Sequence, residues 1–77
     1  MPRYKKEYSV WYYLEEHDEW KKMFVDFRTE SNAKEVRDEC LTRRGVGGAF
    51  VSLTETVQLC MLSNRKEITL TTYTVLL

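Results

Sequence analysis

His17 is the one histidine of the chain, and it stands directly before Asp18. An imidazole beside a carboxylate is a combination that can act as a general base. No motif ties a serine or a cysteine to His17 as a nucleophile, and both residues are of types that suit a solvated turn. We therefore predict that the chain has no catalytic residues and is not an enzyme.

The residues that bind metal ions in other proteins are too few here, or wrongly spaced. Cys40 and Cys60 lie twenty positions apart, which matches no zinc motif together with His17. The acidic residues of the stretch 15–19 lack the spacing of a calcium loop: Glu15, Glu16, Asp18 and Glu19. We expect no metal site and no cofactor. We also expect both cysteines to be reduced and to lie on opposite faces, too far apart for a disulfide.

A glycine-rich stretch covers residues 45–48, with glycine at positions 45, 47 and 48. Phosphate-binding glycines precede a helix, whose first N–H groups point at the phosphate. Here the glycines follow a segment with helical spacing. We therefore interpret Gly45 as the end of a helix and Val46-Gly47-Gly48 as a flexible connection.

The composition indicates one small globular domain. The chain has 77 residues, of which 43% are hydrophobic and 31% charged, and its twelve basic residues balance twelve acidic ones. Zero net charge argues against a protein that binds nucleic acid by neutralising phosphates. No apolar run approaches the roughly 20 residues that cross a bilayer. We expect a single domain over 1–77, no membrane partner, and a cytoplasmic location, in the host cytoplasm if a virus encodes it.

Aromatic and β-branched residues over 8–14, and alternation over 23–29, predict two strands of a hairpin within 8–29. We expect residues 1–7 to be frayed. A turn centred on His17-Asp18 would pair apolar residues on one face: Tyr8 with Phe27, Val10 with Val25, and Tyr12 with Met23.

Residues 31–44 have the spacing of an amphipathic helix. Ser31 or Asn32 is expected as the N-cap, with Asn32 and Glu35 resembling a capping box. Arg43 and Arg44 are expected as cations of the last turn. The predicted apolar face contains Ala33, Val36, Cys40 and Leu41.

Alternation resumes over 49–77 and predicts a second hairpin. A turn centred on Asn64-Arg65 would pair Leu59 with Leu70, Met61 with Ile68, and Leu53 with Leu76. Glu55 interrupts this apolar face, so we expect a bulge or break near Thr54-Glu55. The predicted fold is α+β in the order ββαββ: a four-stranded antiparallel sheet of two hairpins with one helix on one face.

The most informative surface is the face of the first hairpin that points away from the predicted core. There the register places Trp11 opposite Phe24, with Tyr13 and Trp20 nearby. Exposed aromatic area of this kind marks interaction sites. We therefore predict a partner-binding surface formed by Trp11, Tyr13, Trp20, Phe24, Glu15, Glu16, Asp18 and Glu19. Two alternatives stay open: coiling of the sheet buries this face under loops or the tail, or the assignment of faces is partly reversed.

The outer face of the second hairpin is polar but uncharged, which also suits sheet packing or strand addition across a two-fold axis. The partner is therefore expected to be a larger protein or a second copy of the chain. In size, neutrality and element order, the chain resembles small inhibitors of host defence encoded by phages or mobile elements, such as anti-CRISPR proteins. That resemblance implies a non-catalytic inhibitor whose acidic residues 15–19 imitate nucleic-acid phosphates or block a basic channel.

The alternative function is a nucleic-acid-binding domain. Aromatic residues on an open sheet can stack on bases while nearby cations contact the backbone. The chain has basic pairs for this purpose at Lys5-Lys6, Lys21-Lys22, Arg43-Arg44 and Arg65-Lys66.

Overall fold

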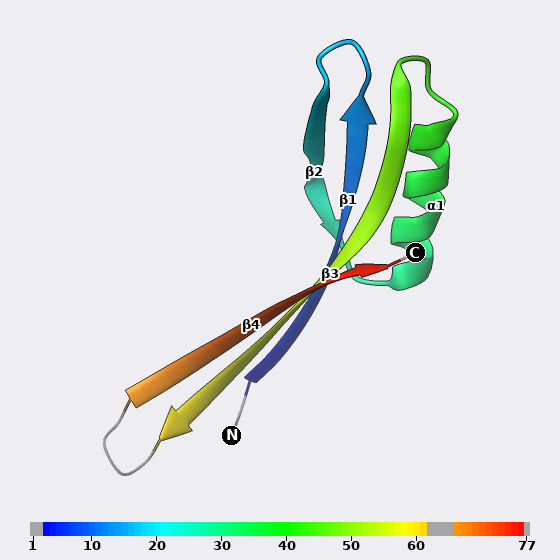
Figure 1. Cartoon of the computed structure of the whole chain (residues 1–77). Coiled ribbons are helices and arrows are strands. Elements are labelled where there is room, and N and C mark those ends of the chain that lie inside the picture. Colours follow the sequence, from blue (N-terminus) through cyan, green and yellow to red (C-terminus); the bar gives the residue numbers. More distant parts are fainter. Residues whose placement is uncertain (1–2, 62–65, 77) are drawn as a thin grey trace.

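The computed structural model of the chain describes the backbone of residues 3–61 and 66–76, and the side chains of residues 3–59 and 67–76. Its elements follow in the order β1 (Arg3–Leu14), β2 (Glu19–Phe27), α1 (Glu30–Leu41), β3 (Val46–Met61) and β4 (Lys66–Leu76). The four strands form one sheet in the order β2-β1-β3-β4, and α1 packs against one face (Figure 1). The predicted α+β fold of two hairpins and one helix is therefore confirmed.

The central position of β1 explains why a helix separates the two hairpins. β1 pairs antiparallel with both β2 and β3. β2 and β3 consequently run parallel to each other, with β1 between them. Parallel strands of one sheet need a crossover connection, and α1 supplies it.

Helix α1 begins one residue before the predicted 31–44 and ends three residues earlier, with a threonine as the cap at each end. Thr29 is the N-cap, and its Oγ1 accepts a hydrogen bond from the backbone N–H of Asn32 at 3.3 Å. The predicted N-caps, Ser31 and Asn32, are therefore wrong. Thr42 is the C-cap, so Arg43 and Arg44 lie beyond the helix rather than in its last turn. Gly45 follows with a φ of 89°, a left-handed conformation that favours glycine.

The core is small and lies between α1 and the middle of the sheet. Among the described residues, its buried hydrophobic members are Tyr8, Val10, Ala33, Cys40 and Val51. Cys40 is a buried free thiol, whereas the side chain of Cys60 lies outside the described residues. Leu41 was predicted on the apolar face of the helix but is 47% exposed.

The helix is too short to cover the sheet. Twelve residues of α-helix span about 18 Å, whereas the sixteen residues of β3 span about 53 Å. The molecule measures 55 × 25 × 19 Å, and α1 lies over one end of the sheet while the other end extends away from it (Figure 1). The covered half comprises α1, β2, residues 8–14 of β1, residues 46–53 of β3 and residues 75–76 of β4. The bare ribbon comprises residues 3–7, 54–61 and 66–74.

The N-terminal segment belongs to this ribbon. Residues 1–7 were expected to be frayed, but residues 3–7 extend β1 and pair with β3, for example Tyr4 with Val57; residues 1 and 2 lie outside the description. The Tyr4 hydroxyl donates a hydrogen bond to the Glu55 carboxylate, which raises the pKa of Tyr4. The expectation was wrong because the long β3 gives these residues a partner strand.

The register of the second hairpin differs by two residues from the predicted one. Leu59 faces Ile68 rather than Leu70, and Leu76 faces Val51 rather than Leu53. The shift preserves which residues share a face. Pairing runs without a bulge through Glu55, so the break predicted near Thr54-Glu55 is absent from the described β3–β4 ladder. The predicted turn at Asn64-Arg65 and the side chain of Met61 lie outside the described residues.

The bulge occurs in the first hairpin instead. Tyr8 pairs with Phe27 as predicted, and Ser9 pairs with Asp26. The next described pair is Trp11 with Lys22, so residues 23–25 of β2 lie opposite a single residue of β1. The predicted pairs Val10–Val25 and Tyr12–Met23 are therefore wrong. The connecting turn covers residues 15–18 rather than centring on His17-Asp18.

Candidate functional site

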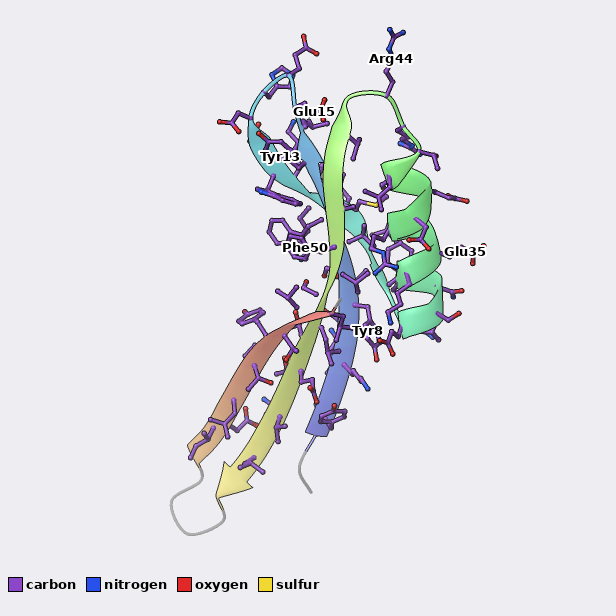
Figure 2. The ribbon with its side chains drawn as sticks, turned by 45° about the vertical axis from the view of Figure 1, so that its right-hand side comes forward. Tyr8, Tyr13, Glu15, Glu35, Arg44 and Phe50 are labelled. Atoms are coloured by element: carbon purple, nitrogen blue, oxygen red, sulfur yellow. The ribbon has the colours of Figure 1, made fainter. Side chains whose placement is uncertain are left out.

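Four aromatic side chains from three neighbouring strands gather on the sheet face opposite α1. Trp11 and Phe50 stack with ring centroids 6.0 Å apart and planes 8° from parallel. The ring of Trp20 lies 5.1 Å from Phe50 and 5.3 Å from Tyr13. Tyr13 and Phe50 lie on this side of the sheet, whereas Tyr8 lies between sheet and helix (Figure 2). We call Trp11, Tyr13, Trp20 and Phe50 the aromatic cluster.

Strand pairing positions these rings. Trp11 is the direct partner of Phe50, and Tyr13 is the direct partner of Trp20, so each pair shares one face. Trp11 Nε1–H also donates a hydrogen bond to Ser52 Oγ at 3.1 Å. The cluster is therefore fixed by backbone pairing, ring contacts and one polar anchor before any partner arrives.

The glycines after α1 make room for this arrangement. A Cβ at Gly48 would lie 3.3 Å from Cη2 of Trp20, which is tighter than ordinary packing. A Cβ at Gly47 would lie 2.7 Å from Oε1 of Glu15. The prediction that 46–48 form a flexible connection is wrong: these residues begin β3, where Val46 and Gly48 pair with β1 and the register shifts at Gly47. Glycine is placed here for close approach.

Phe24 does not join the cluster. The bulge at residues 23–25 separates it from Trp11, and its side chain is fully exposed. It lines an open groove of about 360 Å³ together with Met23, Val25 and Arg43. The assignment of faces was therefore partly reversed, as one of the open alternatives stated. The other alternative, burial of the whole face, does not hold for Trp20, which is 47% exposed.

Phe50 is the member of the cluster that the sequence analysis missed. Alternation from the buried Val51 places Phe50 on the face away from the helix. Its contact with Trp11 depends on β3 lying directly beside β1, and nothing in the pattern of either hairpin specifies that strand order.

The acidic residues lie at the end of the hairpin beside the cluster. Glu15, Glu16 and Asp18 are in the turn, Glu19 is the first residue of β2, and all four are exposed. We call these four residues the acidic tip. The Tyr13 hydroxyl donates a hydrogen bond to Oδ1 of Asp18, which raises the pKa of Tyr13 and joins the tip to the cluster.

The backbone holds this tip against the covered half. The N–H of Glu15 donates a hydrogen bond to the carbonyl oxygen of Gly45 at 3.0 Å. Figure 2 shows Glu15 at the end of the hairpin, next to the loop that carries Arg44. The carboxylates of the tip therefore project from an anchored turn.

In the described part of the chain, the candidate general base and the candidate metal ligands are not brought together with other reactive groups. His17 is exposed in the turn. No three His, Cys, Asp or Glu side chains among the described residues come together as metal ligands. Within the same residues, no helix has the length and apolar character needed to cross a membrane.

Comparison of the chain with protein-family models, with curated proteins and with solved structures finds no significant match.

Proposed function

We propose that this chain is a non-catalytic protein-binding module that docks on a larger protein through the aromatic cluster and the acidic tip. The observation that carries the proposal is the half-exposed ring of Trp20, supported by Tyr13 and Phe50 on the face opposite α1. Tryptophan and tyrosine dominate protein–protein hot spots, and a ring already held in place loses little entropy on binding.

Charge favours a protein over a nucleic acid at this surface. The tip brings four carboxylates next to the cluster, and these repel a phosphate backbone. The nearby cation Lys22 is partly engaged by an acidic neighbour, since its Nζ lies 3.8 Å from Oδ1 of Asp26. A partner with a basic, partly apolar surface complements both features.

The same charge argues against self-association through this surface. Two copies docked around a two-fold axis through the tip would place like charges close together. A larger protein is therefore the partner that we propose here. In the form suggested by the resemblance to anti-CRISPR proteins, the module is a phage- or mobile-element-encoded inhibitor in the host cytoplasm. Its tip then occupies a basic channel that otherwise receives nucleic acid.

The test compares two aromatic residues on opposite sides of the sheet. The immobilised wild-type chain, Trp20→Ala and Phe24→Ala are each incubated with extract of the source organism, untreated and nuclease-treated, and captured proteins are identified by mass spectrometry. We expect one partner to bind wild type and Phe24→Ala, and to bind Trp20→Ala about tenfold more weakly or worse, as for a hot-spot residue. Phe24 is the matched control because it is exposed but outside the cluster.

Circular dichroism of Trp20→Ala checks that the fold survives, and Trp20→Phe provides a variant that keeps an aromatic ring against Tyr13 and Phe50. Equal capture by Trp20→Ala and wild type would remove the proposal. So would a partner lost on Phe24→Ala but kept on Trp20→Ala. Capture that disappears after nuclease treatment would support the nucleic-acid alternative instead.

A further inference from the structure

The chain exposes more surface than a compact protein of its size. Its accessible surface is 6260 Å², whereas a compact monomer of 9.2 kDa exposes about 4,900 Å². Its radius of gyration is 16.1 Å, compared with about 11.5 Å for a compact chain of 77 residues. The elongated bare ribbon accounts for this difference, because it carries no helix on either face (Figure 1).

The ribbon continues the apolar face of the core without a cover. On the side that α1 covers elsewhere, the row of residues that includes Val51 and Leu53 is interrupted by Glu55 and resumes with Val57 and Leu59. Beside it on β4 lie Ile68 and Leu70. The exposed large hydrophobic side chains of this face are Tyr4, Leu59, Ile68 and Leu70. Exposed apolar residues gathered on one face in this way mark an interaction surface.

Strand β4 is an unprotected edge. It pairs with β3 on one side, and no described strand pairs with its other side. Natural edge strands are protected by charges, proline, bulges or short length. Residues 68–76 contain no charged residue, no proline and no glycine, and the described β3–β4 ladder has no bulge. The backbone N–H and C=O groups along this edge are therefore available to another strand.

We propose that a second copy of this chain pairs with the outer edge of β4, so that the two sheets become one. Two edge strands related by a two-fold axis perpendicular to the sheet run antiparallel, and the same surface serves both copies. Full overlap of the two β4 strands, Lys66–Leu76, places Thr71 opposite its own copy. In that register, Leu70 faces Thr72 of the second copy, and Ile68 faces Thr74.

The lack of charged residues over 68–76 of β4 favours a second copy of the chain as the partner of its outer edge. A strand without charges over residues 68–76 meets itself across the axis without repulsion, and it offers no charge by which a different partner would be selected. The ribbon gives the chain an excess surface of about 1,300 Å² over a compact protein of its size, and pairing of the two β4 edges buries part of it. The aromatic cluster lies on the covered half, so this inference does not depend on the proposed function.

The test introduces a charged side chain at position 71, which lies at the proposed two-fold axis. Sedimentation equilibrium and light scattering are applied to the wild-type chain, Thr71→Lys and Thr71→Val over a range of concentrations. We expect wild type to reach twice the chain mass of 9.2 kDa and to stay there. Thr71→Lys should raise the dimer Kd about tenfold or more, because the two lysines face each other and protect the edge. Thr71→Val keeps a β-branched residue and should remain a dimer.

Three results would overturn the inference: a wild-type chain that stays monomeric at high concentration, a dimer that Thr71→Lys leaves unchanged, or a mass that keeps growing beyond two copies. A far-UV spectrum shows whether Thr71→Lys folds. If it does not, hydrogen exchange of the wild type decides the question. Amides of residues 67–76 should exchange more slowly as concentration rises, and exchange independent of concentration would overturn the inference.

Discussion

The covered half and the bare ribbon are parts of one sheet with one pattern of alternation, yet they end in different environments. In the covered half, Val10 and Val51 are completely buried beneath α1. In the ribbon, the same rows continue into residues such as Val57 and Leu70, where α1 no longer reaches. Alternation thus determines which residues share a face, and the length of the helix determines which of them are buried.

The two halves also differ in where their charges lie. The acidic tip beside the covered half brings four carboxylates together, and α1 contains six charged residues, whereas the outer strand of the ribbon, β4, is uncharged over residues 68–76. A charged surface keeps a protein soluble and resists nonspecific association. The halves therefore suit different contacts: a charged, aromatic surface on the covered half and a neutral strand edge on the ribbon.

The largest expected effect comes from the same substitution made once in each half. Val10→Ala removes two buried methyl groups from a core with few buried side chains, and should lower the free energy of unfolding by about 2–3 kcal/mol. Val57→Ala changes the strand propensity equally but removes a half-buried side chain, so we expect a loss below about 1 kcal/mol. Urea unfolding at low protein concentration, where the chain is monomeric, measures both.

Equal losses for Val10→Ala and Val57→Ala would contradict the division into halves, because they would show that the ribbon is packed as tightly as the core. A variant with Val51→Ala serves as a second probe of the core. It should behave like Val10→Ala, since Val51 is its direct partner on β3 and is equally buried.

Elements, most faces and the place of the helix in the chain were predictable because each depends on local patterns. Alternation around Val51 and helical spacing from Ala33 to Cys40 identify a strand and a helix whatever their partners are. The register at Tyr8–Phe27 was also predictable from its apolar match. By contrast, the bulge at residues 23–25 leaves no local mark, since hydrophobic residues there suit either a regular strand or a bulge.

The candidate site was only partly predictable, because it depends on contacts between distant segments. Trp11, Tyr13 and Trp20 come from one hairpin and were predicted together. Phe50 joins them from β3, and Phe24 leaves them because of the bulge. The unprotected edge of β4 also depends on the strand order, which is set by contacts between distant segments. The bare ribbon follows from the observed lengths, twelve residues of helix against sixteen of strand, and the longer helix predicted over 31–44 did not indicate it.

A second prediction concerns how each half depends on protein concentration. If the ribbon is stabilised by a second copy, the melting temperature should rise by about 3–5 °C for each tenfold increase in concentration, by mass action. Thr71→Lys should remove most of this dependence while leaving the melting temperature of the dilute chain nearly unchanged. Calorimetry or circular dichroism over a hundredfold range of concentration measures it.

If the melting temperature of the wild type did not depend on concentration, the ribbon would not be stabilised by a second copy, and this prediction would be wrong. Phe24→Lys is the matched control, because it adds the same charge to an exposed residue of the covered half. It should keep the concentration dependence of the wild type.

The smallest expected effect is on stability, and it comes from removing the hydrogen bond of one tyrosine in each half. Tyr13 donates a hydrogen bond to Asp18 at the tip, and Tyr4 donates one to Glu55 in the ribbon; each bond raises the pKa of its tyrosine above the ordinary value of 10.0. A raised pKa in the folded state means that the bond stabilises the fold fully below pH 10. That contribution is lost as the pH rises through the folded-state pKa.

Tyr13→Phe and Tyr4→Phe should therefore each lower stability slightly near neutral pH, and both differences from wild type should shrink above about pH 10. Urea midpoints from about pH 8 to about pH 11 measure this, and subtraction of each variant from wild type cancels the other titrating groups. Both side chains are solvated, so the effects should be small and similar in the two halves. A difference that grows with pH would contradict the raised pKa values of these tyrosines, because an ionised tyrosine cannot donate to a carboxylate and the bond must weaken as the tyrosine ionises.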